Sequence, residues 1–316
     1  MYKTALVILC TVFATASLAQ NNKVQKDTSF TLNATFVKEQ KKRPFISIAI
    51  PKAKSDVIIN KDIIYRKIGV RSLGLDIYYP KRIHKRKPAV LLIFGGGWRS
   101  GDKSQNEAMS TALANRGYVA VSAEYRLSGE AQYPAAVYDL KAALKWMKLN
   151  AKNYGIDSNR ISTLGVSAGG QLAALIGTTN CNPLFEDTIG VGQGHVTTNI
   201  HSAIDIDGIL AFHHPESAES LVASQWLGGT YEQRPDRWKE ASALEHITNQ
   251  TVPFLFINSS LPRFHAGRTD FIKLLDSLHI YSEVHTIDDT PHPFWFFNPW
   301  FDPMMEHIIG FLKKTN

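Results

Sequence analysis

The apolar pattern of the chain becomes regular from about residue 62, where it is typical of β-strands. Residues 63–68 are rich in β-branched and aromatic side chains, and every second position between residues 73 and 77 is apolar. Arg71 and Ser72 lie between these two segments, so we expect a hairpin that turns there. Residues 89–94 form an uninterrupted apolar run, which is typical of a strand buried on both faces.

Beyond residue 94, apolar runs alternate with segments of helical periodicity. Further strands are predicted at residues 118–123, 160–166, 202–207, 254–258 and 282–287. Helices are predicted at residues 106–115, 134–147, 168–177, 268–278 and 304–314. A hairpin followed by repeated strand–helix units predicts an α/β fold, with a mostly parallel central sheet and helices on both faces. No Pro-, Gly- or Ser-rich linker interrupts the run, so residues 57–316 are expected to form one domain.

The first 19 residues have the pattern of a secretory signal peptide. A short basic head containing Lys3 precedes an apolar run, and Ser17 and Ala19 provide small residues at −3 and −1 of a cleavage site after Ala19. The apolar run is well short of the roughly 20 residues that a membrane-spanning helix needs. We therefore expect export to the periplasm or the extracellular space, without stable membrane insertion. Residues 20–56 are polar, Lys-rich and weakly periodic, and are interpreted as an N-terminal extension.

Composition and charge exclude several classes of function. The chain is 44% hydrophobic and 20% charged, which is a globular balance and not that of a disordered protein. Its net charge is +7, and the basic run at residues 81–87 first suggests nucleic acid. No aromatic residues interleave with that run, and an export signal removes the usual partner, so a solvated turn is the better interpretation. Two cysteines, Cys10 and Cys181, cannot form a disulfide framework or a zinc cluster. We expect no cofactor, no metal and no nucleic-acid partner, and the oligomeric state is not predicted.

The sharpest chemical signal is a G-x-S-x-G motif at residues 165–169, with Ser167 at its centre. It lies between a predicted strand and an Ala-rich predicted helix. The glycines allow a tight strand-to-helix turn that lifts the serine hydroxyl above the sheet at the helix N-terminus. A plain N-cap serine is the alternative interpretation. The flanking elements favour a nucleophile.

A serine nucleophile needs hydrogen-bond donors for the oxyanion that develops during attack. Three consecutive glycines, residues 95–97, follow the first central strand. They let backbone N–H groups face a tetrahedral intermediate without obstruction by side chains. The predicted donors are the amides of Gly96, Gly97 and Ala168, and a merely flexible loop is the alternative.

Several motifs along the chain occur in the same order in α/β-hydrolase carboxylesterases, which the chain resembles from about residue 60 to residue 314. These motifs are Gly95-Gly96-Gly97-Trp98, Gly101-Asp102-Lys103, Tyr125-Arg126-Leu127, Tyr133-Pro134-Ala135-Ala136, Tyr154-Gly155-Ile156-Asp157, and Gly165–Gly170 with Leu172-Ala173-Ala174. Among such enzymes the chain looks most like bacterial esterases that trim ester groups from plant cell-wall polysaccharides, including feruloyl, acetyl and pectin esterases. It departs from the family at Phe94, where a histidine usually precedes the glycines. That histidine is structural and does not transfer protons, so the oxyanion hole is unaffected.

The resemblance implies a histidine base in the loop after the last strand, because that loop returns over the serine. Of the 11 histidines, His292 lies in that loop with a proline on each side, and the prolines restrict the backbone. His285 and His307 fall within a predicted strand and a predicted helix. The alternative for His292 is a loop histidine packed on Trp295.

The acid that orients the base is left open among several carboxylates. Its usual place is just past the strand at residues 254–258, but no carboxylate follows that strand directly. Asp207 is the first candidate, because it ends the preceding strand and some α/β-hydrolases take their acid from that position. Asp270, at the start of the next helix, is the second, with a first-turn helix acid as its alternative role. Glu216 and Asp289 remain as further candidates.

Substrate recognition is suggested by residues in the loops around the serine. Arg99, Arg263 and Arg268 suit a carboxylate, because a guanidinium offers paired N–H donors. Trp98 and the aromatic residues between 295 and 301 are expected either to form a platform for a sugar ring or to pack the C-terminal helix.

Together these features predict an exported serine esterase that removes ester groups from a cell-wall polysaccharide or oligosaccharide. Pectin is the first choice because of the positive net charge and the loop arginines, and the sequence does not separate methyl from acetyl esters. The alternatives are an acetylxylan or feruloyl esterase, or a lipase or peptidase on the same fold. A catalytically silent carbohydrate-binding module is the alternative that is not an enzyme.

Overall fold

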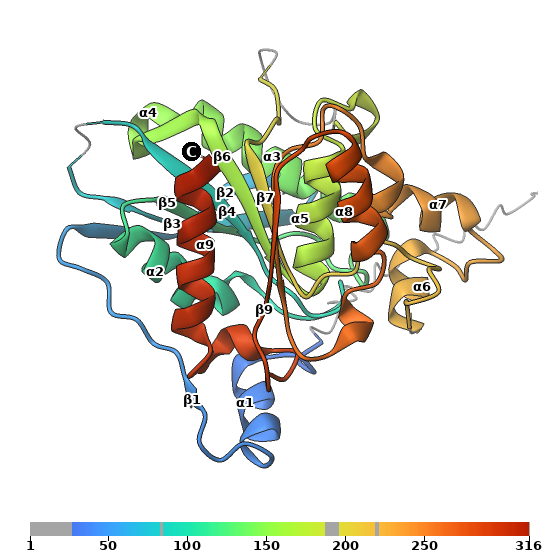
Figure 1. Ribbon diagram of the computed structural model, residues 1–316. Coiled ribbons are helices and arrows are strands. Elements are labelled where there is room, and N and C mark those ends of the chain that lie inside the picture. The colour runs from blue at the N-terminus through green and yellow to red at the C-terminus, as the bar shows by residue number, and fades with distance from the viewer. Residues whose placement is uncertain (1–26, 83–84, 187–195, 219–220, 316) are drawn as a thin grey trace, which may run out of the picture.

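An eight-stranded sheet forms the centre of the protein (Figure 1). The computed structural model describes residues 27–82, 85–186, 196–218 and 221–315, so the predicted signal peptide lies outside the described residues. The strands in spatial order are β2 (Val57–Ile68), β3 (Arg71–Pro80), β5 (Val119–Ala123), β4 (Lys87–Ile93), β6 (Ile156–Val166), β7 (Ser202–Ile206), β8 (Phe254–Asn258) and β9 (Ser282–Thr286). A second, two-stranded sheet pairs β1 (Ser47–Ile48) with β10 (Phe297–Asn298).

The strand directions follow from the connections. The hairpin strands β2 and β3 are antiparallel, and β3 also pairs antiparallel with β5. All further pairs, from β5 through β4, β6, β7 and β8 to β9, are parallel. The described helices are α1 (Leu32–Gln40), α2 (Glu107–Asn115), α3 (Ala135–Leu149), α4 (Ala151–Tyr154), α5 (Ala168–Thr178), α6 (Leu221–Leu227), α7 (Pro235–Glu240), α8 (Arg268–Ser277) and α9 (Phe301–Thr315).

Two hydrophobic clusters cover the two faces of the sheet. Side chains of β4 alternate between them: Leu91 and Ile93 face the cluster that includes α3, α5 and α8, whereas Val90 and Leu92 face the cluster that includes α2 and α9. In Figure 1, β6 accordingly runs between α9 on one side and α5 and α8 on the other. The predicted mostly parallel sheet with helices on both faces is confirmed.

The predicted position of the hairpin turn is wrong by two residues. Arg71 and Ser72 belong to β3, and Ile68 pairs with Arg71, so the turn consists of Gly69 and Val70. Gly69 has a φ of 56°, a left-handed conformation that glycine adopts without steric cost. The glycine was therefore the better signal for the turn.

The N-terminal extension contains a helix that its sequence did not reveal. In α1, Thr31 caps the N-terminus by accepting a hydrogen bond from the backbone N–H of Ala34 at 3.2 Å. Phe30 and Phe36 pack against the cluster that includes α9. The apolar partner of α1 is thus remote in sequence, which is why local periodicity did not show it. None of the described helices is long and apolar enough to cross a bilayer.

Candidate active site

Ser167 lies in a sharp turn between the end of β6 and the start of α5. Its backbone has a φ of 55° and a ψ of −122°, a conformation that is rare for a residue with a side chain. The flanking glycines make the turn possible: a Cβ on Gly165 would lie 1.9 Å from the carbonyl oxygen of Gly169. A Cβ on Gly169 would lie 2.1 Å from the carbonyl oxygen of Ile93. The G-x-S-x-G spacing is therefore a steric requirement of this turn.

A chain of two hydrogen bonds links Ser167 to His292 and Asp207. The imidazole Nε2 of His292 lies 2.9 Å from the Ser167 hydroxyl oxygen, and its Nδ1 lies 2.8 Å from Oδ2 of Asp207. Ser167 follows β6, Asp207 follows β7, and His292 lies in the loop after β9. These strands are parallel, so their carboxyl ends meet at one edge of the sheet and bring the three side chains together.

The carboxylate of Asp207 is buried and held by several donors. Its Oδ1 accepts the backbone N–H of Ser259 at 2.7 Å and lies 3.2 Å from Nε2 of His265. Burial alone would raise the pKa of Asp207, but hydrogen bonds from His265, His292 and Ser259 outweigh burial and lower the pKa. Asp207 is thus a stable anion at neutral pH. Ser259, in the stretch where the acid was first sought, supplies a backbone donor instead.

The other candidate acids lie elsewhere. Asp270 is half-exposed and pairs with Lys273 at 3.0 Å and with His214 at 3.3 Å. Glu216 accepts the backbone N–H of Gly267 at 3.0 Å. Asp289 is exposed in the loop that follows β9. Among the four carboxylates considered from the sequence, the structure places Asp207 against His292.

The imidazole of His292 is enclosed by aromatic rings. Phe264 stacks on it with ring centroids 3.5 Å apart, and Trp295 meets it edge-on at 5.1 Å. Burial lowers the pKa of His292, Asp207 raises it, and the charges of Arg263 and His265 lower it further, so the net shift is downward. The imidazole is therefore neutral at neutral pH, which is the state that can accept a proton from Ser167.

The glycine loop lies directly against the serine. A Cβ on Gly95 would lie 3.1 Å from Cβ of Ser167. Gly97 and Ala168 line one cavity with Ser167, and Gly96 and Gly97 line a second one with Ser167 and His292. The three residues predicted to supply oxyanion donors therefore line cavities that Ser167 also lines.

Two cavities meet at Ser167, and we name each by an aromatic residue in its lining. The Trp98 cavity has a volume of about 270 Å³. Its lining is mostly apolar and comprises Gly97, Trp98, Ser167, Ala168, Asp207, Ile209, Ser217, Ala218, Val222, Ala223, Arg263 and Phe264. The Phe30 cavity has a volume of about 370 Å³ and is lined by Ser29, Phe30, Gly96, Gly97, Arg99, Ser167, Val222 and His292.

Only some of the residues predicted to bind substrate line a cavity beside Ser167. Trp98, Arg99 and Arg263 line the cavities beside Ser167. Arg268 is half-buried and its Nη1 has no hydrogen-bond partner among the described residues. Its charge interacts instead with the buried Asp205 and with Asp207. The structure thus does not bring Arg268 into the lining of these two cavities.

The C-terminal aromatic residues pack the protein and do not form a sugar platform. Trp295, Phe296, Phe297, Trp300 and Phe301 are all buried in the cluster that includes α9. Of the aromatic residues proposed from the sequence, Trp98 lines a cavity. It stacks on Trp226 at 4.7 Å and donates a hydrogen bond to Gln171 at 3.0 Å.

Sequence reasoning missed His265, Phe264 and the N-terminal residues Ser29 and Phe30. His265 and Phe264 lie between Arg263 and Arg268, in one of the loops that the sequence analysis places around the serine, and an imidazole in that loop was a usable signal. Ser29 and Phe30 had no local signal, because their role depends on a contact remote in sequence. Among the described residues, no group of three or more His, Cys, Asp and Glu side chains is placed to hold a metal ion.

Comparison with known protein families identifies the family of this chain. The BD-FAE family model matches residues 75–261, which is more than half of the sequence. The chain belongs to the BD-FAE family. Esterase LipC of Mycobacterium tuberculosis is 31% identical over 194 residues, which cover 59% of this chain and 47% of LipC. The chain spans about half the length of the curated relatives it matches.

Solved structures share the fold over most of this BD-FAE chain. Esterase 2 of Thermogutta terrifontis, phosphoramylated by tabun, is 25% identical with a TM-score of 0.68, over 84% of this chain and 96% of that chain. A truncated carbohydrate esterase from gut microbiota is 22% identical with a TM-score of 0.66, over 84% and 99% of the two chains. The resemblance to α/β-hydrolase carboxylesterases and the fold that it implies are confirmed.

Proposed function

We propose that this protein is a serine carboxylesterase with Ser167 as nucleophile, His292 as general base and Asp207 as the orienting acid. The observation that carries the proposal is the continuous hydrogen-bonded chain from the Ser167 hydroxyl through both ring nitrogens of His292 to Asp207. Family membership and the names of the relatives support ester hydrolysis as the reaction. A catalytically silent binding module would have no need for this alignment.

The reaction proceeds through an acyl-enzyme. The Ser167 oxygen bonds to the ester carbonyl carbon while its proton passes to Nε2 of His292, and the amides of Gly96, Gly97 and Ala168 stabilise the oxyanion. The carbon–oxygen bond to the alcohol then breaks, and His292 returns the proton to the departing alcohol. A water molecule, deprotonated by His292, releases the acid and restores Ser167. Asp207 stabilises the imidazolium that forms in each step.

The substrate class that we propose is an ester on an exported cell-wall polysaccharide, with pectin as the first choice. Arg263 supports pectin, because it lines the Trp98 cavity and can donate paired hydrogen bonds to a uronate. The signal-peptide pattern supports export, and sequencing of the mature N-terminus after Ala19 tests it. Acetylated xylan and feruloylated polysaccharide are the alternative substrates, distinguished by measuring methanol, acetate and ferulate release from a mixed panel.

The test of the catalytic proposal is Ser167→Ala, compared with Ser277→Ala as a matched control on the exposed face of α8. Ser167→Ala should reduce turnover of p-nitrophenyl acetate at least about 10³-fold with an unchanged melting curve, whereas Ser277→Ala should retain it. A fluorophosphonate should add one phosphonyl group to Ser167 of the wild type and none to Ser167→Ala. More than a few per cent activity in a folded Ser167→Ala variant would exclude this nucleophile.

A further inference from the structure

The position of His292 indicates which of the two cavities beside Ser167 holds the alcohol half of the ester. In the proposed mechanism His292 returns a proton to the departing alcohol, so the alcohol must lie within hydrogen-bond reach of its Nε2. His292 lines the Phe30 cavity. The alcohol half of the ester therefore occupies the Phe30 cavity, and the acyl half occupies the Trp98 cavity, which Ser167 also lines.

The wall of the Phe30 cavity is built partly by the N-terminal segment. The Ser100 hydroxyl donates to the carbonyl oxygen of Asp27 at 2.8 Å and accepts the backbone N–H of Phe30 at 3.2 Å. The side chain of Gln105 donates to the carbonyl oxygen of Phe30 at 2.8 Å, and the rings of Phe30 and Phe296 lie 6.0 Å apart. The segment is thus fixed at both backbone and side chain. It lies outside residues 75–261, so the family match does not account for it.

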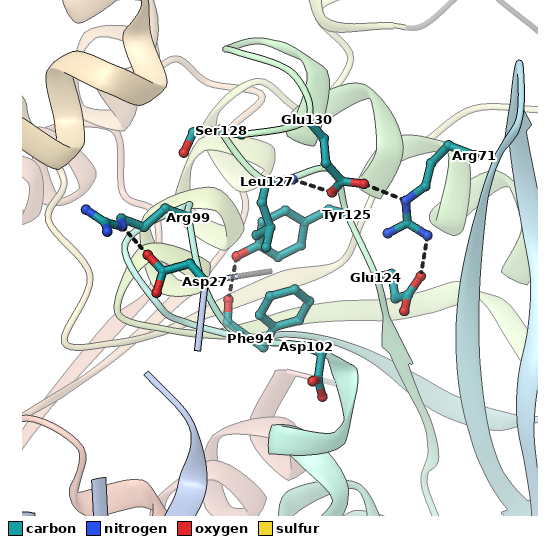
Figure 2. A pocket seen from close by; sticks show the side chains of 12 residues that line it. Asp27, Arg71, Phe94, Arg99, Asp102, Glu124, Tyr125, Leu127, Ser128 and Glu130 are labelled. Carbon is teal, nitrogen blue, oxygen red and sulfur yellow. Dashed lines mark hydrogen bonds and ion pairs between the residues drawn. The ribbon is translucent and has the colours of Figure 1, made fainter. Parts of the chain in front are cut away.

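A third cavity, of about 420 Å³, shares Arg99 with the Phe30 cavity (Figure 2). We call it the Glu130 cavity; Arg99 lines both this cavity and the Phe30 cavity. Arg99 is held by Asp27 at 2.5 Å, and Glu130 accepts a hydrogen bond from Arg71 at 2.6 Å; Figure 2 shows both pairs in the lining of this cavity, with Leu127 and Tyr125 between them. Charged side chains of this kind hydrogen-bond strongly to hydroxyl groups. The Phe30 cavity is thus larger than the Trp98 cavity, and its Arg99 also lines a cavity that has several charged side chains in its wall.

We propose that Ser29, Phe30 and Arg99 form the binding site for a sugar residue that is the alcohol half of the ester. The inference rests on the proposed esterase function. A half-buried aromatic ring beside a hydroxyl and a guanidinium matches a sugar, which presents an apolar C–H face and a rim of hydroxyls. The N-terminal segment is accordingly a specificity element of this enzyme, and the substrates that it selects are sugars acylated on a hydroxyl.

A residue that touches only the alcohol has a distinct kinetic signature. It affects formation of the acyl-enzyme for that alcohol, but it does not affect hydrolysis of the acyl-enzyme, because the alcohol has already left. Two esters of the same acid therefore isolate its contribution. The two esters are methyl acetate and an acetylated oligosaccharide. Acetylated oligosaccharides from xylan and from pectin are both assayed first, and the one that the wild type cleaves faster is used.

Phe30→Ala should lower the ratio of kcat/KM for the acetylated oligosaccharide to kcat/KM for methyl acetate about tenfold, through loss of the aromatic contact. Phe30→Tyr, which keeps the ring, should preserve the ratio. Phe36→Ala is the matched control, because Phe36 packs against the same core cluster, with its ring 5.9 Å from that of Phe297, and does not line the Phe30 cavity. It should leave the ratio unchanged. The deacetylation rate after an acetyl-enzyme burst should be the same in all variants.

A second variant keeps the test decisive if Phe30→Ala fails to fold. Ser29 is exposed, so Ser29→Trp narrows the cavity without removing a packed side chain. It should lower kcat/KM far more for the oligosaccharide than for methyl acetate, whose alcohol half is a single methyl group. Equal losses on both esters, an unmoved ratio, or a wild type that cleaves methyl acetate but neither oligosaccharide would overturn the sugar site. A wild type that cleaves no ester would instead overturn the proposed function itself.

Discussion

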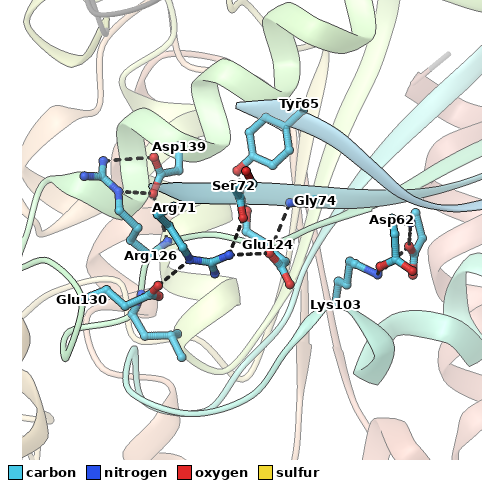
Figure 3. Close-up of polar contacts among 12 residues, drawn as sticks. Asp62, Tyr65, Arg71, Ser72, Gly74, Lys103, Glu124, Arg126, Glu130 and Asp139 are labelled. Carbon is cyan, nitrogen blue, oxygen red and sulfur yellow. Dashed lines mark hydrogen bonds and ion pairs between the residues drawn. The ribbon is translucent and has the colours of Figure 1, made fainter. Parts of the chain in front are cut away.

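Asp207 and Asp139 are both buried carboxylates, yet they are held by different kinds of partner. Asp139, on α3, contacts two guanidinium groups, those of Arg66 at 3.0 Å and Arg126 at 2.8 Å, and Figure 3 shows the second pair. Among the described residues, the hydrogen-bond partners of the Asp207 carboxylate are instead the imidazoles of His292 and His265 and the backbone N–H of Ser259. One carboxylate faces permanent cations, and the other faces groups that are neutral or titrate.

This difference separates a structural carboxylate from a functional one. A guanidinium stays charged at every physiological pH, so Asp139 is neutralised permanently and ties α3 to β2 and to the loop after β5. The carboxylate of Asp207 accepts no hydrogen bond from a guanidinium among the described residues, and in the proposed mechanism its charge stabilises His292 when the imidazole takes up a proton. Burial of a carboxylate therefore does not indicate its role, whereas the chemistry of its donors does.

The most direct test of the role of Asp207 removes its charge without changing the shape of its side chain. Asp207→Asn should lower kcat by about 10⁴-fold with little change in KM, because the amide favours the wrong tautomer of His292 and cannot stabilise the imidazolium. Steady-state kinetics on p-nitrophenyl acetate measure the effect. Asp270→Asn is the matched control, since that half-exposed side chain pairs with Lys273 and should cost little. The reverse ranking would transfer the acid role to Asp270.

The same substitution at Asp139 should act on stability and not on chemistry. Asp139→Asn leaves two guanidinium groups without their buried partner, which should lower the free energy of unfolding by about 3–5 kcal/mol. Urea denaturation measures this loss, and kcat of the folded fraction should stay close to the wild-type value. A large loss of kcat at unchanged stability would show that the Asp139 cluster contributes to the reaction, and the distinction between the two carboxylates would fail.

Much of the fold and the centre of the site were predictable because their signals are local. The buried strands, the G-x-S-x-G turn and the glycine loop each depend on a few consecutive residues. The proposed acid, Asp207, could not be chosen from such local signals. It lies 85 residues from His292 in the sequence and contacts it only because of the spatial order of the strands. Phe30 and Phe264 were not predictable for the same reason: each acts through a contact between segments that the sequence does not relate.

Arg263 and Arg268 also differ in their surroundings, and this difference concerns substrate binding. Arg263 lines the Trp98 cavity, whereas Arg268 is half-buried, lines neither cavity beside Ser167 and interacts electrostatically with the buried Asp205 and Asp207. In a methyl-esterified pectic substrate the uronyl chain is the acyl half and lies toward the Trp98 cavity. On that substrate Arg263→Ala should lower kcat/KM roughly tenfold to hundredfold and barely affect p-nitrophenyl acetate, because a charge-assisted hydrogen bond contributes about 1.5–3 kcal/mol.

Arg268→Ala serves as the contrasting variant in the same assay. It should lower activity on both esters in parallel or reduce stability, because its charge serves the protein interior. Parallel losses for Arg263→Ala would remove the support for a uronate substrate. No loss for Arg263→Ala would favour a neutral polysaccharide such as acetylated xylan.

The smallest expected effect concerns pH, and it tests whether His292 is the titrating partner of Asp207. Burial lowers the pKa of His292 below its usual 6.5, and only the neutral imidazole accepts a proton. Activity should therefore be present above the lowered pKa and be lost as the pH falls through it, so the acidic midpoint of kcat/KM lies below pH 6.5. The positive charge of Arg263 also lowers this pKa, so Arg263→Gln should move the midpoint upward toward 6.5, and added salt should move it in the same direction by screening that charge. A midpoint above 6.5 in the wild type, or a downward shift in Arg263→Gln, would show that a different group limits the reaction.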